Sequence, residues 1–362
     1  MGGPLSNKTA VAGLGTALTE CKLFHVPAKG RSHDGSARLI DADLMQARNI
    51  VRRFLTATPL ERAADLSTEF GRDVYLKLEN CSPIRSFKCR GGIVAAEALT
   101  PQERRNGVVV ASTGNHGQGV AFAGQLFDVD VVVVVPEQAE ETKVTAMAGL
   151  GAKVVMAGAG LLEAEDEAKR LARETGALYI EDGDHAQLMA GASSVLWEML
   201  EEQPHLDTVL VPVGGGNLLG ATLLAAAMLR PSLRVIGVQS SSAPAVLLSW
   251  LAGETISAPC HTFAAGLATE RPGRLALNVA SALLSDMALV TDDDLRSAMV
   301  LGYETTGLPI EAAAAAGIAA LVRYGSDIPG ERIGIIVTGG RVSFPDLAHA
   351  FAQRDRLSKR AF

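Results

Sequence analysis

The chain has 362 residues, of which 48% are hydrophobic and 20% charged, and its formal net charge at pH 7 is -7. This composition excludes a disordered chain, a collagen and a coiled coil, and the negative charge gives no general electrostatic basis for binding nucleic acid or an anionic membrane. A small-molecule enzyme built from one large or two medium domains is therefore the default expectation.

Cysteine usage and hydropathy indicate the compartment. The four cysteines are too few for a disulfide framework and form no CxxC pair. No apolar run reaches the roughly 18 residues that a membrane helix needs, and the first thirteen residues hold Lys8 but no sustained apolar stretch. We expect a cytoplasmic protein with reduced thiols.

The first predicted element is a helix that follows an irregular N-terminal extension. Residues 1–45 show no clear periodicity, which predicts the extension. Asp41 or Asp43 can cap a helix that runs to Phe54 and ends before Thr58-Pro59.

Beyond this helix, strand-like runs alternate with helical ones. Strands are predicted at 74–78, 107–111, 131–135, 153–156, 208–213, 234–239 and 333–338, and helices at 87–98, 117–126, 141–150, 162–174, 188–201 and 218–229. The alternation predicts parallel sheets with helices on both faces. Because such sheets bind ligands at the carboxyl ends of their strands, the loops after Ala111, Val213 and Val337 are the candidate site.

Two polar motifs follow predicted strands in the first half of the chain. Ser86-Phe87-Lys88-Cys89-Arg90-Gly91-Gly92 places a lysine at the start of a helix. Ser112-Thr113-Gly114-Asn115-His116-Gly117-Gln118-Gly119 lies at a helix N-terminus, where free backbone N–H groups suit a carboxylate or phosphate. Taken alone, the first motif also fits an ordinary solvated lysine and the second a capped turn.

Two glycine-rich motifs follow strands in the second half. Pro212-Val213-Gly214-Gly215-Gly216-Asn217 allows several backbone amides to converge on one anion, although the Walker pattern GxxxxGK[ST] is absent and a bare GGG turn is often structural. Thr338-Gly339-Gly340-Arg341 places a hydroxyl at the end of a late strand and means little by itself.

In this order the four motifs resemble those of the fold-type II pyridoxal phosphate enzymes, and specifically the serine/threonine dehydratase family. The resemblance extends from about Ala47 to about Phe344 and includes Thr58-Pro59-Leu60, residues 263–268 and Glu311. It implies an α/β fold of the tryptophan synthase β type, with two doubly wound sheet domains and pyridoxal 5'-phosphate in the cleft between them. The predicted domains are the extension at 1–45, a large cofactor-binding domain at 46–88 and 185–362, and a small domain at 89–184.

The resemblance also implies the residues that hold the cofactor. Lys88 would bond covalently to the cofactor aldehyde and later remove the substrate Cα proton. Phe87 would pack against the ring and Asn115 would hydrogen-bond its 3-hydroxyl. The phosphate would lie at a helix N-terminus on Gly214, Gly215, Gly216 and Asn217.

Thr338 and the loop at 112–116 bear on the reaction type. In the family a neutral hydroxyl, here Thr338, faces the pyridine nitrogen and leaves it largely unprotonated, which favours loss of a β leaving group over transamination. The substrate carboxylate would be held by Ser112, Thr113, Gly114 and His116. Gly-Asn-His resembles dehydratases and racemases, whereas cysteine synthases usually carry threonine in place of His116. Racemases carry a serine base where this chain has Thr113, so Thr113 either supplies such a base or merely lines the loop.

Several positions depart from the family pattern. Members with a divalent-metal site have Glu and Asp where this chain has Gln239 and Ala245, so we expect that metal site to be absent. Asn217 replaces a fourth glycine of the phosphate loop and is tolerable because Asn accepts the left-handed backbone region. Ala265 stands where an acidic residue is common.

Two arginines also depart from the pattern and flank the expected cofactor site. Arg85 replaces the usual glycine before Ser86, and Arg341 replaces the usual asparagine after the two glycines. We hypothesise that one of them binds an acidic or extended substrate side chain through charge-assisted hydrogen bonds. The alternative is an arginine directed to solvent.

The sequence thus predicts a pyridoxal phosphate-dependent ammonia-lyase that converts a serine- or threonine-type hydroxy amino acid to a 2-oxo acid and ammonia. The alternative is an amino-acid racemase or β-replacement enzyme of the same fold, and a catalytically silent cofactor-binding protein is less favoured. We expect an amino-acid substrate, no nucleic-acid or membrane partner and, by resemblance, a homodimer.

Overall fold

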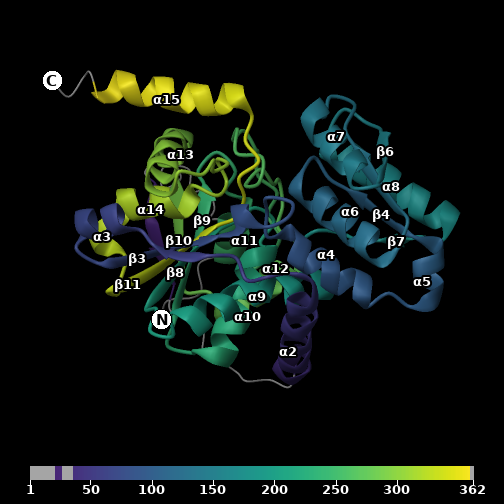
Figure 1. The fold of residues 1–362 in the computed structure, drawn as a ribbon, viewed down its shortest axis with the longest axis horizontal. Coiled ribbons are helices and arrows are strands. Elements are labelled where there is room, and N and C mark those ends of the chain that lie inside the picture. The colour runs from purple at the N-terminus through teal and green to yellow at the C-terminus, as the bar shows by residue number, and fades with distance from the viewer. Residues whose placement is uncertain (1–20, 27–35, 359–362) are drawn as a thin grey trace, which may run out of the picture.

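The computed structural model describes residues 21–26 and 36–358 and contains two β-sheets (Figure 1). The seven-stranded sheet has, in spatial order, β1 (Leu23–His25), β10 (Asp286–Val290), β9 (Arg234–Ser240), β8 (Thr208–Pro212), β11 (Arg332–Val337), β3 (Asp73–Leu78) and β2 (Leu60–Arg62). The four-stranded sheet has β6 (Lys153–Met156), β5 (Val131–Val135), β4 (Val108–Ala111) and β7 (Leu178–Tyr179).

Helices connect and cover these strands. They are α2 (Ser36–Phe54), α3 (Ala64–Phe70), α4 (Lys88–Glu97), α5 (Pro101–Asn106), α6 (Asn115–Phe127), α7 (Glu141–Gly149), α8 (Leu161–Thr175), α9 (Ala186–Glu202), α10 (Asn217–Leu229), α11 (Ala245–Ala252), α12 (Arg274–Leu283), α13 (Asp292–Thr306), α14 (Ala316–Tyr324) and α15 (Phe344–Ser358). Short 3₁₀ turns, η1 (Glu79–Cys81) and η2 (Gly325–Asp327), follow β3 and α14.

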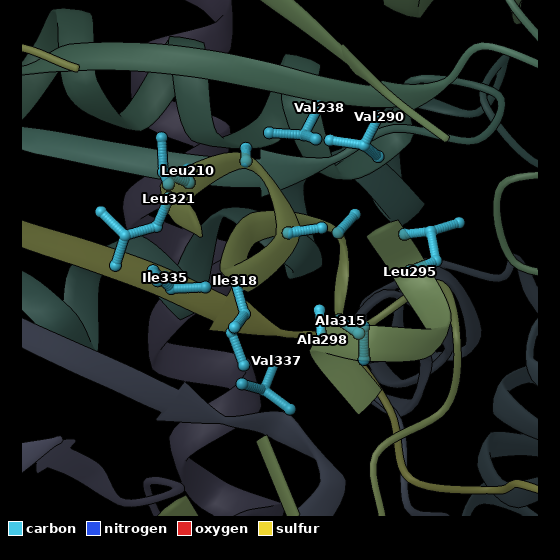
Figure 2. Packing of buried hydrophobic residues seen from close by; sticks show 14 of the residues in the cluster. Leu210, Val238, Val290, Leu295, Ala298, Ala315, Ile318, Leu321, Ile335 and Val337 are labelled. Carbon is cyan, nitrogen blue, oxygen red and sulfur yellow. The ribbon is translucent and has the colours of Figure 1, made fainter. Parts of the chain in front are cut away.

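Helices cover both faces of the large sheet. Because successive side chains of a strand point to opposite faces, neighbouring residues pack against different helices. In β8, Leu210 packs with α13 and α14, whereas Val209 and Val211 pack with α9 and α10. Figure 2 shows the first of these layers, in which Leu321 and Ile318 of α14 lie beside strand residues such as Leu210. The inner strands of this sheet are parallel, which confirms the predicted α/β class.

Helices also cover both faces of the small sheet. In β5, Val133 packs with α6 and α7, whereas Val134 packs with the alanines of α8. All strand pairs of this sheet are parallel. The predicted strand Val131–Val135 agrees with β5 at both ends.

The edges of the large sheet differ from the prediction. Part of the expected irregular extension forms β1, which pairs antiparallel with β10, and α2 begins at Ser36 rather than after Asp43. The other edge strand, β2, is also antiparallel to its neighbour. Residues 1–20 and 27–35 of the extension lie outside the described part of the chain.

Helix α4 is held tightly between α6 and α9. A Cβ on Gly92 would collide with the carbonyl oxygen of Gly119 in α6, and a Cβ on Gly91 would lie 2.7 Å from the carbonyl oxygen of Leu188 in α9. Glycine at these positions allows the helix backbones to approach closely. The N-terminal end of α4, which begins at Lys88, is therefore fixed in the framework.

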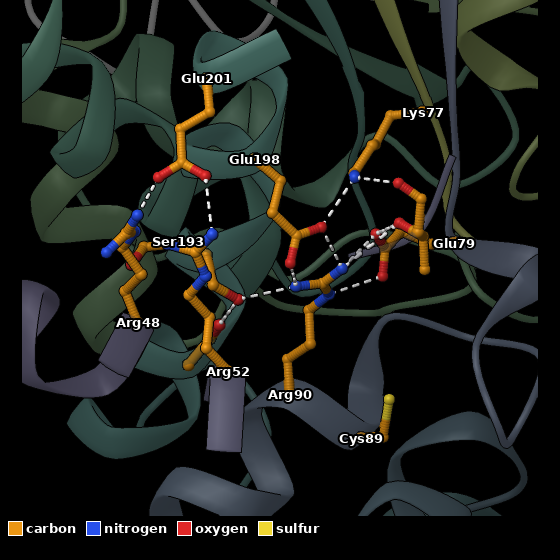
Figure 3. Close-up of polar contacts among 12 residues, drawn as sticks. Arg48, Arg52, Lys77, Glu79, Cys89, Arg90, Ser193, Glu198 and Glu201 are labelled. Atoms are coloured by element: carbon orange, nitrogen blue, oxygen red, sulfur yellow. Dashed lines mark hydrogen bonds and ion pairs between the residues drawn. The ribbon is translucent and has the colours of Figure 1, made fainter. Parts of the chain in front are cut away.

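A buried charge network also ties α4 to its neighbours (Figure 3). The Arg90 guanidinium lies between two carboxylates, with Nε 2.7 Å from Glu79 Oε2 and Nη1 2.6 Å from Glu198 Oε1. Lys77 Nζ of β3 lies 2.7 Å from Glu198 Oε2. Because each buried charge has a partner of opposite sign, the network joins β3, η1, α4 and α9 without leaving an unpaired charge.

Two further observations concern the hydropathy of the helices and the state of the cysteines. Among the residues that the structure describes, no helix is long and apolar enough to cross a membrane. All four cysteines are free.

Candidate active site

A cavity of about 490 Å³ lies at the carboxyl ends of strands from both sheets. Its walls include the segments that follow β4, β8 and β11, together with the start of α4. All candidate cofactor and substrate residues line it except Arg85: Phe87, Lys88, Ser112, Thr113, Gly114, Asn115, His116, Gly214, Gly215, Gly216, Asn217 and Thr338. The strand-end rule thus located the cavity from the sequence.

Lys88 enters the cavity from the first turn of α4. Its Nζ lies 5.1 Å from the centroid of the Phe87 ring. The Phe87 backbone N–H donates to the Thr338 carbonyl oxygen at 3.2 Å, and Ser86 forms an isolated β-bridge with Gly339. The lysine motif and the Thr338 motif are therefore joined directly, although about 250 residues separate them in the sequence.

Asp182 faces Lys88 and was not predicted from the sequence. One of its carboxylate oxygens pairs with Lys88 Nζ, and the other accepts a hydrogen bond of 3.3 Å from Asn217 Nδ2. Burial opposes ionisation of Asp182, but the Lys88 ammonium, His116 and Asn217 outweigh it and lower the Asp182 pKa from 3.8 to about 2. Asp182 is therefore a carboxylate at neutral pH. No motif contains it, because it lies in the segment between β7 and α9.

The loop at 112–116 is shaped by the Ser112 hydroxyl. Ser112 Oγ accepts hydrogen bonds from the backbone N–H groups of Gly114 at 3.1 Å and Gly117 at 2.9 Å. Ser112 thus holds the turn, and α6 begins at Asn115. His116 is buried behind the loop, where loss of hydration lowers the pKa of its imidazole. It is therefore neutral at pH 7.

The Asn115 amide reaches across the cavity wall to Glu311. Asn115 Nδ2 donates to Glu311 Oε1 at 2.9 Å. Loss of hydration raises the pKa of Glu311 from 4.5 to about 7, against the opposing effects of Asn115, Lys143, Arg341 and Lys88. Glu311 belongs to the family resemblance, but the sequence alone gave it no role.

The glycine loop has the form of an anion site. Gly216 has a φ of 97°, which places it in the left-handed region, and α10 begins at the next residue. The first N–H groups of a helix lack partners within it and carry the positive end of its dipole. Asn217 Oδ1 is buried without a hydrogen-bond partner in the described part of the chain. A bound group with a phosphate and a donor nearby would fit this loop.

Arg341 and Arg85 differ in their position relative to the cavity. Arg341 lines the mouth of the cavity. Arg85 is exposed and lies outside the cavity wall, and its own carbonyl oxygen accepts a hydrogen bond from Gly340 N at 3.0 Å. Its backbone has a φ of 60°, a left-handed turn that lies just before the cavity-lining Phe87 and Lys88. The structure therefore does not bring Arg85 to the site as predicted.

Two ion pairs outside the predicted motifs join segments in the cavity wall and beside it. Arg271 Nη2, in the segment before α12, lies 3.1 Å from Glu165 Oε2 of α8. Arg274 Nη2 of α12 lies 3.3 Å from Asp184 Oδ1, in the segment before α9. Their pairing depends on chain segments about 90 to 106 residues apart, which sequence spacing does not reveal.

Comparison with known proteins shows which family this chain resembles. Residues 51–339 match the model of a family described as pyridoxal-phosphate dependent enzyme. The chain is 32% identical over 301 residues to an L-threonine ammonia-lyase of Thermotoga maritima, covering 83% of this chain and 75% of the relative. It is also 32% identical over 302 residues to an L-threo-3-hydroxyaspartate ammonia-lyase of Saccharomyces cerevisiae, covering 83% and 92%.

A solved structure gives the same result for the fold. A threonine deaminase isoform of Solanum lycopersicum superposes with a TM-score of 0.86 at 28% identity, covering 91% of this chain and 96% of that one. The chain spans 57% of the length of the biosynthetic L-threonine dehydratase of Salmonella typhimurium. The fold is thus that of the fold-type II group expected from the four motifs.

Proposed function

The chain belongs to the family of pyridoxal-phosphate dependent enzymes, and from this premise we propose that it is an ammonia-lyase for a β-hydroxy amino acid. The products are a 2-oxo acid and ammonia. Relatives named as ammonia-lyases for threonine and for threo-3-hydroxyaspartate support this class of substrate.

One observation carries the proposal. Four segments far apart in the sequence contribute to one cavity a lysine, a loop at a helix N-terminus, a glycine-rich anion loop and a neutral hydroxyl. These are Lys88, residues 112–116, residues 214–217 and Thr338.

Bound pyridoxal phosphate supplies an electron sink for the bond that breaks at the substrate Cα. Residues 214–217 would hold its phosphate, Phe87 would pack on its ring and Thr338 would offer a hydroxyl to its ring nitrogen without adding charge. Asn115 would hydrogen-bond its 3-hydroxyl. The fit rests on the glycine loop and on the unpartnered oxygen of Asn217.

The chain's own groups would then act on the substrate. Lys88 lines the cavity at the start of α4 and, as the family resemblance implies, would be the base that takes the Cα proton. The N–H groups of the 112–116 loop would bind the substrate carboxylate and fix which bond at Cα faces the lysine. A neutral partner at the ring nitrogen favours departure of the β substituent.

Racemisation is the second candidate because Thr113 also lines the cavity. A hydroxyl on the face opposite Lys88 would return the proton to Cα with inversion. Incubating each enantiomer of serine in deuterated water distinguishes the two functions. Deuterium in recovered serine of inverted configuration would favour racemisation, whereas 2-oxo acid without inversion favours elimination.

The test of the proposed function is a visible spectrum with product analysis. Purified wild-type protein should show the absorbance of the lysine-bound cofactor and form a 2-oxo acid from serine, threonine or hydroxyaspartate. Lys88→Ala should lose both. Lys153→Ala is the matched control, because Lys153 of β6 is exposed and lies outside the cavity wall. Absence of oxo acid from every hydroxy amino acid would contradict the proposal.

We also propose the predicted domain division, a cytoplasmic location and a homodimer. The small sheet lies within the predicted small domain at 89–184, and the strands of the large sheet lie outside it. The four free cysteines are compatible with a reducing compartment. Sedimentation equilibrium across a concentration series measures whether the protein is a dimer.

A further inference from the structure

Glu311 is a cavity carboxyl that the proposed mechanism leaves without a role. It lies just before α14, and Asn115 Nδ2 donates to its Oε1 at 2.9 Å. The Gly339 backbone lies so close that a Cβ there would come within 2.5 Å of the same oxygen. The carboxyl is thus fixed between α6 and the Thr338 motif, with its exposed part toward the cavity.

Other carboxyl groups in the cavity wall differ from Glu311 in their partners. Four of the six others lie within 4.0 Å of a lysine or arginine nitrogen: Glu140, Glu165, Glu181 and Asp182. At Asp182 such a cation favours the ionised form and helps to lower the pKa to about 2. Glu311 instead has a neutral amide as its hydrogen-bond partner, so it can keep its proton at lower cost.

The charges that face Glu311 come from three directions. Lys143 of α7, Arg341 after β11 and Lys88 of α4 all favour its ionised form, as does the amide of Asn115 in α6. The loss of water around the carboxyl outweighs them and raises its pKa to about 7. An acid with this pKa is partly protonated at neutral pH and can both give and regain a proton.

The position of Glu311 follows from the groups that must touch the substrate. The substrate carboxylate binds the 112–116 loop and Cα lies next to Lys88, so the β substituent extends into the remaining space of the cavity. Asn115 belongs to that loop and contacts Glu311 directly. The Glu311 carboxyl therefore borders the space that the bound amino acid occupies.

We propose that Glu311 is the catalytic acid that protonates the departing β-hydroxyl group, an inference that rests on the proposed function. Lys88 takes the Cα proton, and the electron pair of that bond forms the Cα=Cβ bond. The Cβ–O bond breaks with its electron pair on oxygen. That oxygen takes the proton of the Glu311 carboxyl and leaves as water. The carboxylate regains a proton from solvent, and Lys88 returns its proton to solvent.

The test compares two leaving groups in one pair of proteins. Hydroxide needs a proton to leave, whereas the chloride of β-chloroalanine does not. We expect Glu311→Gln to lower kcat for serine or threonine by about 100-fold or more, the usual contribution of an acid catalyst, and to leave elimination from β-chloroalanine near the wild-type rate. Glu311→Asp should recover part of the serine rate. Glu181→Gln is the matched control and should leave the ratio of the serine rate to the β-chloroalanine rate unchanged.

Two further measurements separate this role from a structural one. The cofactor absorbance and affinity of Glu311→Gln should equal those of the wild type. The wild-type kcat for serine should fall as the pH rises through about 7, where Glu311 loses its proton, and this fall should be absent for β-chloroalanine and in Glu311→Gln.

Three results would overturn the inference. Equal loss of both reactions in Glu311→Gln would mean that the residue positions other groups, and an unchanged serine rate would mean that another group supplies the proton. Both leave the ammonia-lyase function intact, because wild-type oxo-acid formation measures it independently. If the wild type forms oxo acid from no β-substituted amino acid, the proposed function fails and the inference with it.

Discussion

At the scale of single residues, the cavity holds two carboxyl groups whose surroundings move their pKa values in opposite directions. The Lys88 ammonium and Asn217 help to lower the pKa of Asp182 to about 2, whereas dehydration raises that of Glu311 to about 7. Neighbouring groups separated in this way divide acid and base roles at one pH. Asp182 serves as a permanent negative charge and Glu311 as a proton carrier.

The lowered pKa of Asp182 predicts how its effect on stability depends on pH. Its value lies below the ordinary 3.8, so the stabilisation is present above about pH 4 and is lost as the pH falls toward 2. Urea unfolding of cofactor-free wild type and Asp182→Asn should therefore give a difference in unfolding free energy that is constant near neutral pH and shrinks below pH 4. A difference that stays constant throughout the acid range would contradict the ion pair with Lys88.

Arg341 and Arg85 provide a matched pair for substrate choice. Arg341 lines the cavity mouth and Arg85 lies outside it. We expect Arg341→Ala to lower kcat/KM for hydroxyaspartate by about tenfold relative to serine, since a charged hydrogen bond is worth about 1.5–3 kcal/mol. Arg85→Ala should leave the ratio unchanged. Equal ratios in wild type and Arg341→Ala would exclude recognition of an acidic side chain by this arginine.

At the scale of elements, the fit of α4 between α6 and α9 determines where Lys88 lies. Replacing a helical glycine by alanine ordinarily stabilises a helix by about 0.5–1 kcal/mol. Gly92→Ala should instead destabilise the protein by about 1–3 kcal/mol, because the new Cβ meets the Gly119 carbonyl oxygen.

Gly149→Ala is the control for this substitution. Gly149 is the last residue of α7, and a Cβ there has no atom within 4 Å apart from its chain neighbours and the nearby backbone of its own helix. The unfolding free energy of Gly149→Ala, measured in urea, should equal or exceed that of the wild type. If Gly92→Ala behaved in the same way, the helices would not be in close contact at this point.

At the scale of the whole molecule, the cavity wall joins both sheets through the loop after β4, the loop after β8 and the pair Arg271–Glu165. A ligand that touches both sides should stabilise both sheets together. Cofactor at 100 times its dissociation constant adds about 2.7 kcal/mol of stability by mass action.

Hydrogen exchange checks this coupling. Adding the cofactor should slow amide exchange in peptides that contain α6, beside the small sheet, and α10, beside the large one. Peptides from α3, none of whose residues lines the cavity, serve as the internal control. Protection confined to α10 would contradict a site shared between the sheets.

The sequence predicted most of what lies inside the sheets. Buried valines such as those of β5 and glycines directly after a strand are local signals, so the parallel framework and the cavity position followed from them. The sequence did not predict β1, whose three residues gain their strand form by pairing with β10 more than 260 residues away. The same limit applies to Asp182 and to the Asn115–Glu311 contact, because residues distant in sequence meet only in the folded chain.

The mouth of the cavity differs from its floor in how freely it can change during evolution. Arg341 lines the cavity and is exposed, so substitutions there change few packing contacts. Surface substitutions usually alter stability by less than about 0.5 kcal/mol, whereas α4 tolerates almost no added atom near Lys88. Drift at the mouth can therefore produce descendants with new substrates while the chemistry at the lysine is inherited unchanged.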